Sequence, residues 1–143
     1  MILPDVNVLL YAHRIDAPDH AAYAAWLTRL VTSPEPFALS ELVLAGFLRV
    51  ATNPRAFRDP STLDQALGFV EQLVQRPQCR LLRPGPRHFE LFVALCRQAD
   101  ATGGLVADAY HAALAREHGC EWATSDGDFA RFAGLRWRHP LAG

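Results

Sequence analysis

The chain has 143 residues, of which 50% are hydrophobic and 20% are charged. This length and balance fit one globular domain that buries roughly 70% of its unfolded surface without a disulfide or metal staple. The formal net charge of −1 excludes attraction of nucleic acid by the overall field, so any contact with a polyanion must be local.

The cysteine and lysine counts narrow the class of protein further. The 3 cysteines are odd in number and lie outside any C-x-x-C motif, so we expect neither a disulfide framework nor a zinc site. We therefore expect a protein of the reducing cytoplasm. No apolar run is long enough to cross a bilayer, and the first residues lack the basic start of a signal peptide. All 14 basic residues are arginine, which excludes chemistry that needs a lysine.

Hydrophobic periodicity predicts alternating strands and helices from the start of the chain. The first half is expected to contain a strand at 2–3, a helix after residue 5, a helix over 18–31, a strand at 37–39 and a helix from 41 to about 51. Ser40 is a good N-cap for the last of these helices. That helix should end before Pro54, because the residue before a proline disfavours the α region.

The second half continues the alternation. It is expected to contain a helix that starts within 60–64 and runs through 74, a strand at 79–82, a helix over 88–99, a helix that carries residue 108 and ends at 119, a strand ending at 123, a short helix around 129–132 and a strand at 135–137. This order predicts an α/β fold: a single three-layer domain over residues 1–143, with a central, mostly parallel sheet of four to five strands flanked by helices.

Four acidic residues follow predicted strands or begin predicted helices. They are Asp5, Glu41, Asp108 and Asp126. Because the carboxyl ends of parallel strands form the ligand-binding edge of such a sheet, we expect these carboxylates to meet there. Taken singly, each has an ordinary explanation as an N-cap or as an acid in the first turn of a helix. Pro4 cannot donate to a sheet ladder, so strand pairing should lapse just before Asp5.

Carboxylates gathered in one region repel one another unless a cation or basic side chains neutralise them. No arginine lies within five residues of Asp5, Glu41 or Asp108. Neutralisation must therefore come from elsewhere in the fold or from a metal ion. Oxygen ligands without a paired histidine or cysteine favour Mg²⁺ or Mn²⁺ over zinc.

Five segments of the sequence resemble the PIN-domain ribonucleases, and most closely the VapC-type toxins of bacterial toxin–antitoxin systems. The segments are 1–12, 40–41, 46–54, 107–109 and 124–129, and the match covers nearly the full length. The resemblance implies a PIN-like fold and a metal-dependent endoribonuclease that cleaves tRNA or ribosomal RNA. It also implies a homodimer that a cognate VapB-type antitoxin holds inactive.

The resemblance assigns the metal to the four acids. Asp5 and Asp108 match the family's principal Mg²⁺ ligands. Glu41 and Asp126 match the third and fourth acids, which complete the site directly or through water. The implied cofactor is Mg²⁺, with Mn²⁺ as the alternative. The implied reaction is hydrolysis of a phosphodiester by metal-activated water, with the 3′ oxygen as the leaving atom.

Four polar residues beside the acids receive supporting roles. Asn7 and Thr124 match residues that orient the carboxylates. Ser40, expected to cap its helix, also belongs to this second set. Asp128 either substitutes for the fourth acid or caps a helix in a Ser125-x-x-Asp128 pattern.

Other residues carry weaker hypotheses. Arg49, Arg55 and Arg58 flank a turn and either grip RNA phosphates or remain solvated at the surface. His111 lies three residues after Asp108, so it either reaches the site from the same helical face or packs elsewhere. Trp26 is expected to pack in the core or at a protein interface.

Three alternatives to a nuclease are open at this point. A phospho-acceptor signalling module also gathers acids around Mg²⁺, but it normally needs a lysine in the pocket. A phosphatase of the haloacid dehalogenase type needs Asp-x-Asp, whereas this chain has Asp5-Val6-Asn7. A PIN-like domain that binds partners without turnover is the more serious alternative, and a metal titration with labelled RNA separates it from the nuclease.

Overall fold

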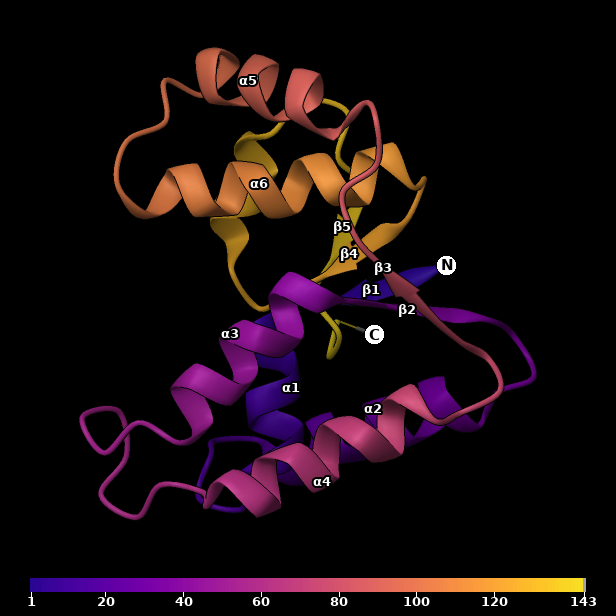
Figure 1. The fold of residues 1–143 in the computed structure, drawn as a ribbon, viewed down its shortest axis with the longest axis vertical. Coiled ribbons are helices and arrows are strands. Elements are labelled where there is room, and N and C mark those ends of the chain that lie inside the picture. Colours follow the sequence, from indigo (N-terminus) through magenta and orange to yellow (C-terminus); the bar gives the residue numbers. More distant parts are fainter. Residues whose placement is uncertain (143) are drawn as a thin grey trace.

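The computed structural model describes residues 1–142, and its elements alternate as the sequence predicts. They are β1 (Ile2–Pro4), α1 (Val6–His13), α2 (His20–Thr32), β2 (Phe37–Ser40), α3 (Glu41–Ala51), α4 (Leu63–Val74), β3 (Cys79–Leu82), α5 (His88–Gln98), α6 (Gly104–Glu117), β4 (Glu121–Ala123), the 3₁₀ helix η1 (Gly127–Arg131) and β5 (Trp137–Arg138). Helices α5 and α6 lie on one side of the strands, and α2 and α4 lie on the other (Figure 1). The predicted α/β fold is confirmed.

Several element ends differ from the prediction by one or two residues, and two of these differences have a clear local cause. Helix α2 begins at His20 rather than at residue 18, because Asp19 adopts the left-handed conformation with φ 58°. Strand β5 lies at 137–138 rather than 135–137, because the Leu135 N–H bonds to the Phe132 carbonyl in a turn. Both differences arise from local backbone conformation at the end of an element, where periodicity carries little information.

The strands form two parallel ladders instead of one continuous sheet. One ladder has the order β1-β4-β5 and the other pairs β2 with β3. Strands β1 and β2 pack against each other without a shared ladder. This break follows from Pro4: the Asp5 N–H points to β4, so the preceding position points to β2, and proline has no N–H to donate there.

The same proline does not interrupt the other ladder. Pairing of β1 with β4 runs through Pro4, which lies opposite Ala123, and the Asp5 N–H then donates to the Ala123 carbonyl at 2.9 Å. The expectation that pairing lapses just before Asp5 is therefore wrong on the β4 side. The ladder holds the first predicted acid at the end of its strand.

A core covered on both faces supports this strand edge. All four residues of β2 are buried, which is typical of a parallel strand between two layers of helices. In β4, Trp122 is fully buried and its ring lies 5.4 Å from that of Phe129 in η1. This packing fixes the corner between β4 and η1, where Asp126 lies. Within residues 1–142, no helix is long and apolar enough to cross a membrane.

A buried arginine ties the long α3–α4 connection to the end of α1. The Arg14 guanidinium is 8% exposed and makes two hydrogen bonds to the Asp16 carboxylate, at 2.9 and 2.8 Å. It also donates to the Asp59 carbonyl at 2.7 Å and lies 3.9 Å above the centre of the Phe57 ring. Its Nη1 also donates to the Ser61 hydroxyl at 3.2 Å, so the planar guanidinium meets four partners at once.

We expect Arg14→Lys to lower the free energy of unfolding by about 2 kcal/mol, because an ammonium group cannot reproduce the fork geometry or the stacking on Phe57. Chemical denaturation measures the change. The control is Arg76→Lys, at an exposed position with no ion pair within residues 1–142. An Arg14→Lys variant as stable as this control would show that the network contributes little.

Candidate metal centre

A cavity of about 520 Å³ lies at the carboxyl ends of β1 and β4. Its walls come from α1, α3, α6 and the corner before η1. The lining residues are Asp5, Val6, Asn7, Leu10, Leu42, Ala45, Gly46, Arg49, Ala107, Asp108, His111 and Asp126. We call it the acid cavity, because its lining contains three of the four predicted acids and only one arginine.

Asp5 is the most completely fixed of these acids. It is 7% exposed, and its Oδ1 accepts the Val6 N–H at 2.6 Å, which caps α1. Its Oδ2 accepts the Thr124 hydroxyl at 2.7 Å and the Asn7 amide at 3.4 Å. The strand end, the helix cap and the neighbouring corner therefore all hold one carboxylate in place.

Thr124 and Asn7 join the corner after β1 to the corner after β4. The Thr124 hydroxyl is fully buried, donates to Asp5 and accepts the Asp126 N–H at 3.0 Å. The side-chain amide oxygen of Asn7, Oδ1, accepts the Ser125 N–H at 3.4 Å. These contacts set the separation of the first and fourth acids through short polar side chains.

The other two acids are held more loosely. Asp108 lies in the second turn of α6, after the glycines that begin the helix. Asp126 caps η1 by accepting the Asp128 N–H at 2.9 Å through Oδ1, which leaves its Oδ2 without a hydrogen bond from residues 1–142. Both side chains can therefore turn toward a ligand in the acid cavity.

Burial and mutual repulsion raise the proton affinity of the site. The pKa of Asp5 is raised to about 6, first by burial and then by the neighbouring Asp108 and Asp126, against the opposing hydrogen bonds from Thr124 and Val6. The pKa of Asp108 is also raised, first by burial and then by Asp126 and Asp128. The protein's own cations thus leave a negative charge in the acid cavity uncompensated.

This donor set fits a hard divalent cation. Carboxylate oxygens are the ligands that Mg²⁺ and Mn²⁺ prefer, and the raised pKa of Asp5 marks a carboxylate that a cation would stabilise. Within residues 1–142 no three histidine, cysteine, aspartate or glutamate side chains already stand in a ligating arrangement. Ligation by all three acids therefore requires movement of the two more loosely held side chains.

Glu41 does not join the other three acids. Its carboxylate pairs with the Arg83 guanidinium at 2.8 Å, and both side chains are largely exposed, at 46% and 70%. The residue lines a different, apolar groove between α3 and α4. In this structure Glu41 is therefore paired with Arg83 and lies outside the lining of the acid cavity, and its role as a metal ligand stays a prediction.

Two residues of the supporting set also lie off the acid cavity. The buried Ser40 hydroxyl caps α3 by accepting the Val43 N–H at 3.3 Å. Asp128 is exposed and lies 4.0 Å from Arg131, while Asp126 performs the capping of η1. Ser40 is thus a helix cap in this structure, whereas Asp128 lies close enough to raise the pKa of Asp108, and the supporting role of both residues stays a prediction.

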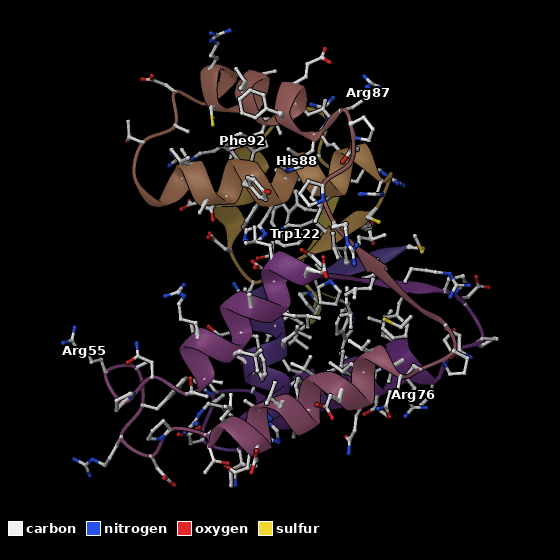
Figure 2. The ribbon with its side chains drawn as sticks, in the orientation of Figure 1. Arg55, Arg76, Arg87, His88, Phe92 and Trp122 are labelled. Carbon is white, nitrogen blue, oxygen red and sulfur yellow. The ribbon has the colours of Figure 1, made fainter. Side chains whose placement is uncertain are left out.

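The three arginines near the α3–α4 turn have different positions. Arg49 lines the acid cavity from α3. Arg55 projects away from the body of the protein in the turn after α3 (Figure 2). Arg58 lines a separate hollow of about 930 Å³ beside Arg14. Arg49 alone of the three is therefore placed to meet a phosphate at the acids.

His111 and Gly46 are wall residues that the sequence signalled only weakly. The His111 ring stacks on Trp122 with a centroid distance of 5.3 Å, its Nδ1 is buried without a hydrogen-bond partner among residues 1–142, and burial lowers its pKa to about 4. The spacing of three residues from Asp108 is the signal for its place. At Gly46 a Cβ atom would lie 3.1 Å from Val6 Cγ2, so glycine permits the close approach of α3 to α1.

Comparisons with known proteins agree with this architecture. A family model described as PIN domain matches residues 2–135. Ribonuclease VapC43 of Mycobacterium tuberculosis (strain ATCC 25618 / H37Rv) is 48% identical over 143 residues, which cover 100% of this chain and 97% of that protein. Ribonuclease VapC31 of the same strain is 46% identical over 140 residues, covering 98% and 99%.

A solved structure shows the same fold at low sequence identity. The crystal structure of VapBC2 from Rickettsia felis, bound to a DNA fragment from their promoter, contains a chain that matches with a TM-score of 0.69. The identity is 20%, and the match covers 96% of this chain and 98% of that chain.

Proposed function

This chain belongs to the PIN-domain family, and from that premise we propose that it is a metal-dependent endoribonuclease, the toxin of a VapBC-type toxin–antitoxin pair. The observation that carries the proposal is the convergence of Asp5, Asp108 and Asp126 on one cavity at the strand ends. Relatives named ribonuclease VapC that are 46–48% identical over at least 98% of the chain support it.

The three acids would hold Mg²⁺, with Mn²⁺ as the alternative. When bound, the ion supplies an activated water and neutralises charge that develops on the phosphate. Thr124 and Asn7 keep the Asp5 carboxylate in one orientation, so it does not have to be ordered when the ion arrives. Arg49 holds the substrate phosphate at the rim of the acid cavity.

A metal titration with labelled RNA tests the proposal. We expect cleavage of RNA by the full chain with Mg²⁺ or Mn²⁺, and none in excess chelator. A PIN-like domain that only binds would retain RNA under both conditions without producing fragments, which would overturn the proposal. Mapping the 5′ ends of cellular RNA fragments after induction identifies the target, which we propose is a tRNA or a ribosomal RNA in the cytoplasm.

The bond between Thr124 and Asp5 leads to a further expectation. Thr124→Val removes the hydroxyl that donates to Asp5 at 2.7 Å but preserves the shape of the side chain. Loss of such a supporting partner typically weakens metal binding by about 10- to 100-fold. Isothermal titration with Mn²⁺ measures the change, and Thr124→Ser, which keeps the hydroxyl, is the matched control. Equal affinities for both variants would contradict the role of this hydrogen bond.

The antitoxin would occupy the apolar groove between α3 and α4, which has a volume of about 440 Å³. Its apolar residues are Leu44, Leu48, Val70, Val74 and Leu81. The Glu71 carboxylate borders it beside the Glu41–Arg83 ion pair, so an amphipathic helix with an arginine opposite Glu71 is complementary. The structure of VapBC2 from Rickettsia felis describes a toxin–antitoxin assembly of the same toxin fold.

Co-expression with a VapB-type antitoxin tests the antitoxin and the oligomeric state together. We expect a stable complex that no longer cleaves RNA, and Leu48→Arg in the groove should prevent its formation. Light scattering of the free chain determines whether it is the homodimer that we also propose. Complex formation by the Leu48→Arg variant would place the antitoxin elsewhere.

A further inference from the structure

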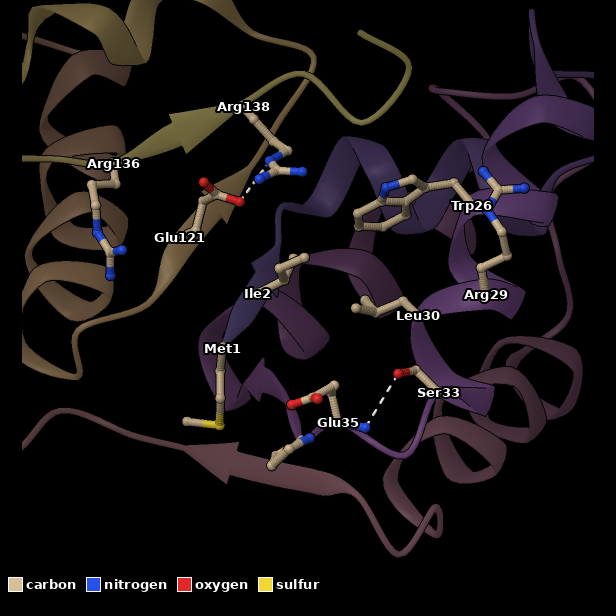
Figure 3. A pocket seen from close by; sticks show the side chains of 11 residues that line it. Met1, Ile2, Trp26, Arg29, Leu30, Ser33, Glu35, Glu121, Arg136 and Arg138 are labelled. Carbon is tan, nitrogen blue, oxygen red and sulfur yellow. Dashed lines mark hydrogen bonds and ion pairs between the residues drawn. The ribbon is translucent and has the colours of Figure 1, made fainter. Parts of the chain in front are cut away.

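A second cavity, of about 620 Å³, lies at the amino ends of β1 and β4, opposite the acid cavity (Figure 3). Helix α2 forms one wall through Trp26, Arg29 and Leu30, and Arg136 and Arg138 on the last segment of the chain form the other. We call it the basic cavity. None of the residues in its lining belongs to the predicted metal site or to the α3–α4 groove.

The basic cavity presents an aromatic ring between cations. The half-buried Trp26 indole extends across it toward Arg138, and Arg29 lies beside the indole (Figure 3). The Arg138 Nε pairs with the Glu121 carboxylate at 2.6 Å, which orients the guanidinium and leaves its terminal amines free for another acceptor. Arg29 has no ion pair or side-chain hydrogen bond within residues 1–142.

The charges of the two cavities are opposite. The basic cavity is lined by three guanidinium groups and by only two carboxylates, those of Glu35 and Glu121. Glu121 is already paired with Arg138. Three carboxylates line the acid cavity against Arg49. Because the whole chain carries a net charge of −1, attraction of a polyanion must come from local groups such as these arginines.

We propose that the basic cavity binds one nucleotide of the RNA substrate away from the cleaved bond, with its base against Trp26 and its two flanking phosphates against Arg29 and Arg138. The proposal rests on the ribonuclease function proposed above. An indole accepts the face of any base, and guanidinium groups bind phosphate through paired donors. Strand β1 has 3 residues, so its two ends are roughly 10 Å apart, and the RNA would contact the two cavities at opposite ends of this strand.

Binding of a labelled single-stranded RNA to the full chain in chelator tests the proposal without cleavage. Arg29→Gln is the main variant because Arg29 is exposed. The control is Arg97→Gln, at an exposed position on α5 with no ion pair in the described part of the chain. We expect Arg29→Gln to lower the slope of log affinity against log salt by about 0.7, the loss of one phosphate contact to a single strand. We expect Trp26→Leu to weaken binding at least about fivefold.

A merely structural role for Arg29 would not change the salt slope. RNA should also quench tryptophan fluorescence more strongly in the wild type than in Trp26→Leu, which retains Trp122 and Trp137. Thermal unfolding checks that the Trp26 variant is folded. Unchanged RNA affinity and unchanged salt slope in Arg29→Gln would overturn the proposal. It would also be overturned if Arg29→Gln or Trp26→Leu lost antitoxin binding but kept RNA binding, because the cavity would then be a protein-binding site. Failure of the wild type to cleave RNA would instead refute the ribonuclease function, and the binding data would still decide the basic cavity.

Discussion

Asp5→Asn is expected to reduce metal-dependent RNA cleavage by more than about a hundredfold, since even the loss of a residue that only orients a ligand weakens a metal site by 10- to 100-fold. Asp5 is the acid with the most fixed position, between the Val6 N–H and the Thr124 hydroxyl. An amide has one oxygen instead of two and carries no charge. It can cap α1 but cannot both cap the helix and bind a cation.

The design separates loss of chemistry from loss of fold. Asp64→Asn, at an exposed position in the first turn of α4, removes a carboxylate of the same type far from the strand ends and is the matched control. Cleavage of a labelled RNA with Mg²⁺ is measured for both variants alongside thermal unfolding. A folded Asp5→Asn variant that cleaves at the wild-type rate would refute the metal assignment.

The sequence could predict the corners of this site because local signals define them. Apolar strands followed by capping residues place Asp5 and Asp126 at the starts of α1 and η1, and the structure shows both as caps. Helical spacing placed Asp108 on α6. Each of these signals lies within a few residues of the acid concerned, so no knowledge of the tertiary structure was needed.

The missed features depend on distant partners. Glu41 lies at a predicted corner, but Arg83 reaches it from 42 residues away, and no local pattern indicates that pairing. The bond from Thr124 to Asp5 spans 119 residues; the family resemblance implied it, but spacing did not. The sequence shows that Pro4 has no N–H to donate. It does not show which neighbouring strand loses this hydrogen bond, because that depends on the Asp5 N–H pointing to β4 in the folded chain.

The acid cavity should also make stability depend on pH in the absence of metal. The pKa of Asp5 is about 6 in the folded chain against 3.8 for the free side chain. The folded state therefore binds this proton more tightly, and ionisation of Asp5 destabilises it as the pH rises through 6. A shift of this size corresponds to about 3 kcal/mol, which is absent below the lower pKa and complete above the higher one.

The pH dependence of the unfolding free energy of the wild type alone would not isolate the Asp5 contribution, because titration of His111 changes stability with pH in the opposite direction. Burial lowers the pKa of His111 to about 4, so the folded state loses stability as the pH falls from 6.5 toward that value. Asp5→Asn retains His111, so subtracting the two unfolding free energies cancels its contribution. In chelator, we expect the stability of Asp5→Asn relative to wild type to increase by most of about 3 kcal/mol between about pH 4 and about pH 7.

Addition of metal should reverse this difference. A cation that binds the folded wild type replaces the repulsion in the acid cavity with attraction, and it stabilises that state in proportion to the logarithm of its concentration above the dissociation constant. At neutral pH, Mg²⁺ or Mn²⁺ should therefore raise the melting temperature of the wild type and of Asp64→Asn but not that of Asp5→Asn. A pH-independent difference in chelator, or equal stabilisation of all three proteins by metal, would mean that Asp5 is an ordinary helix cap.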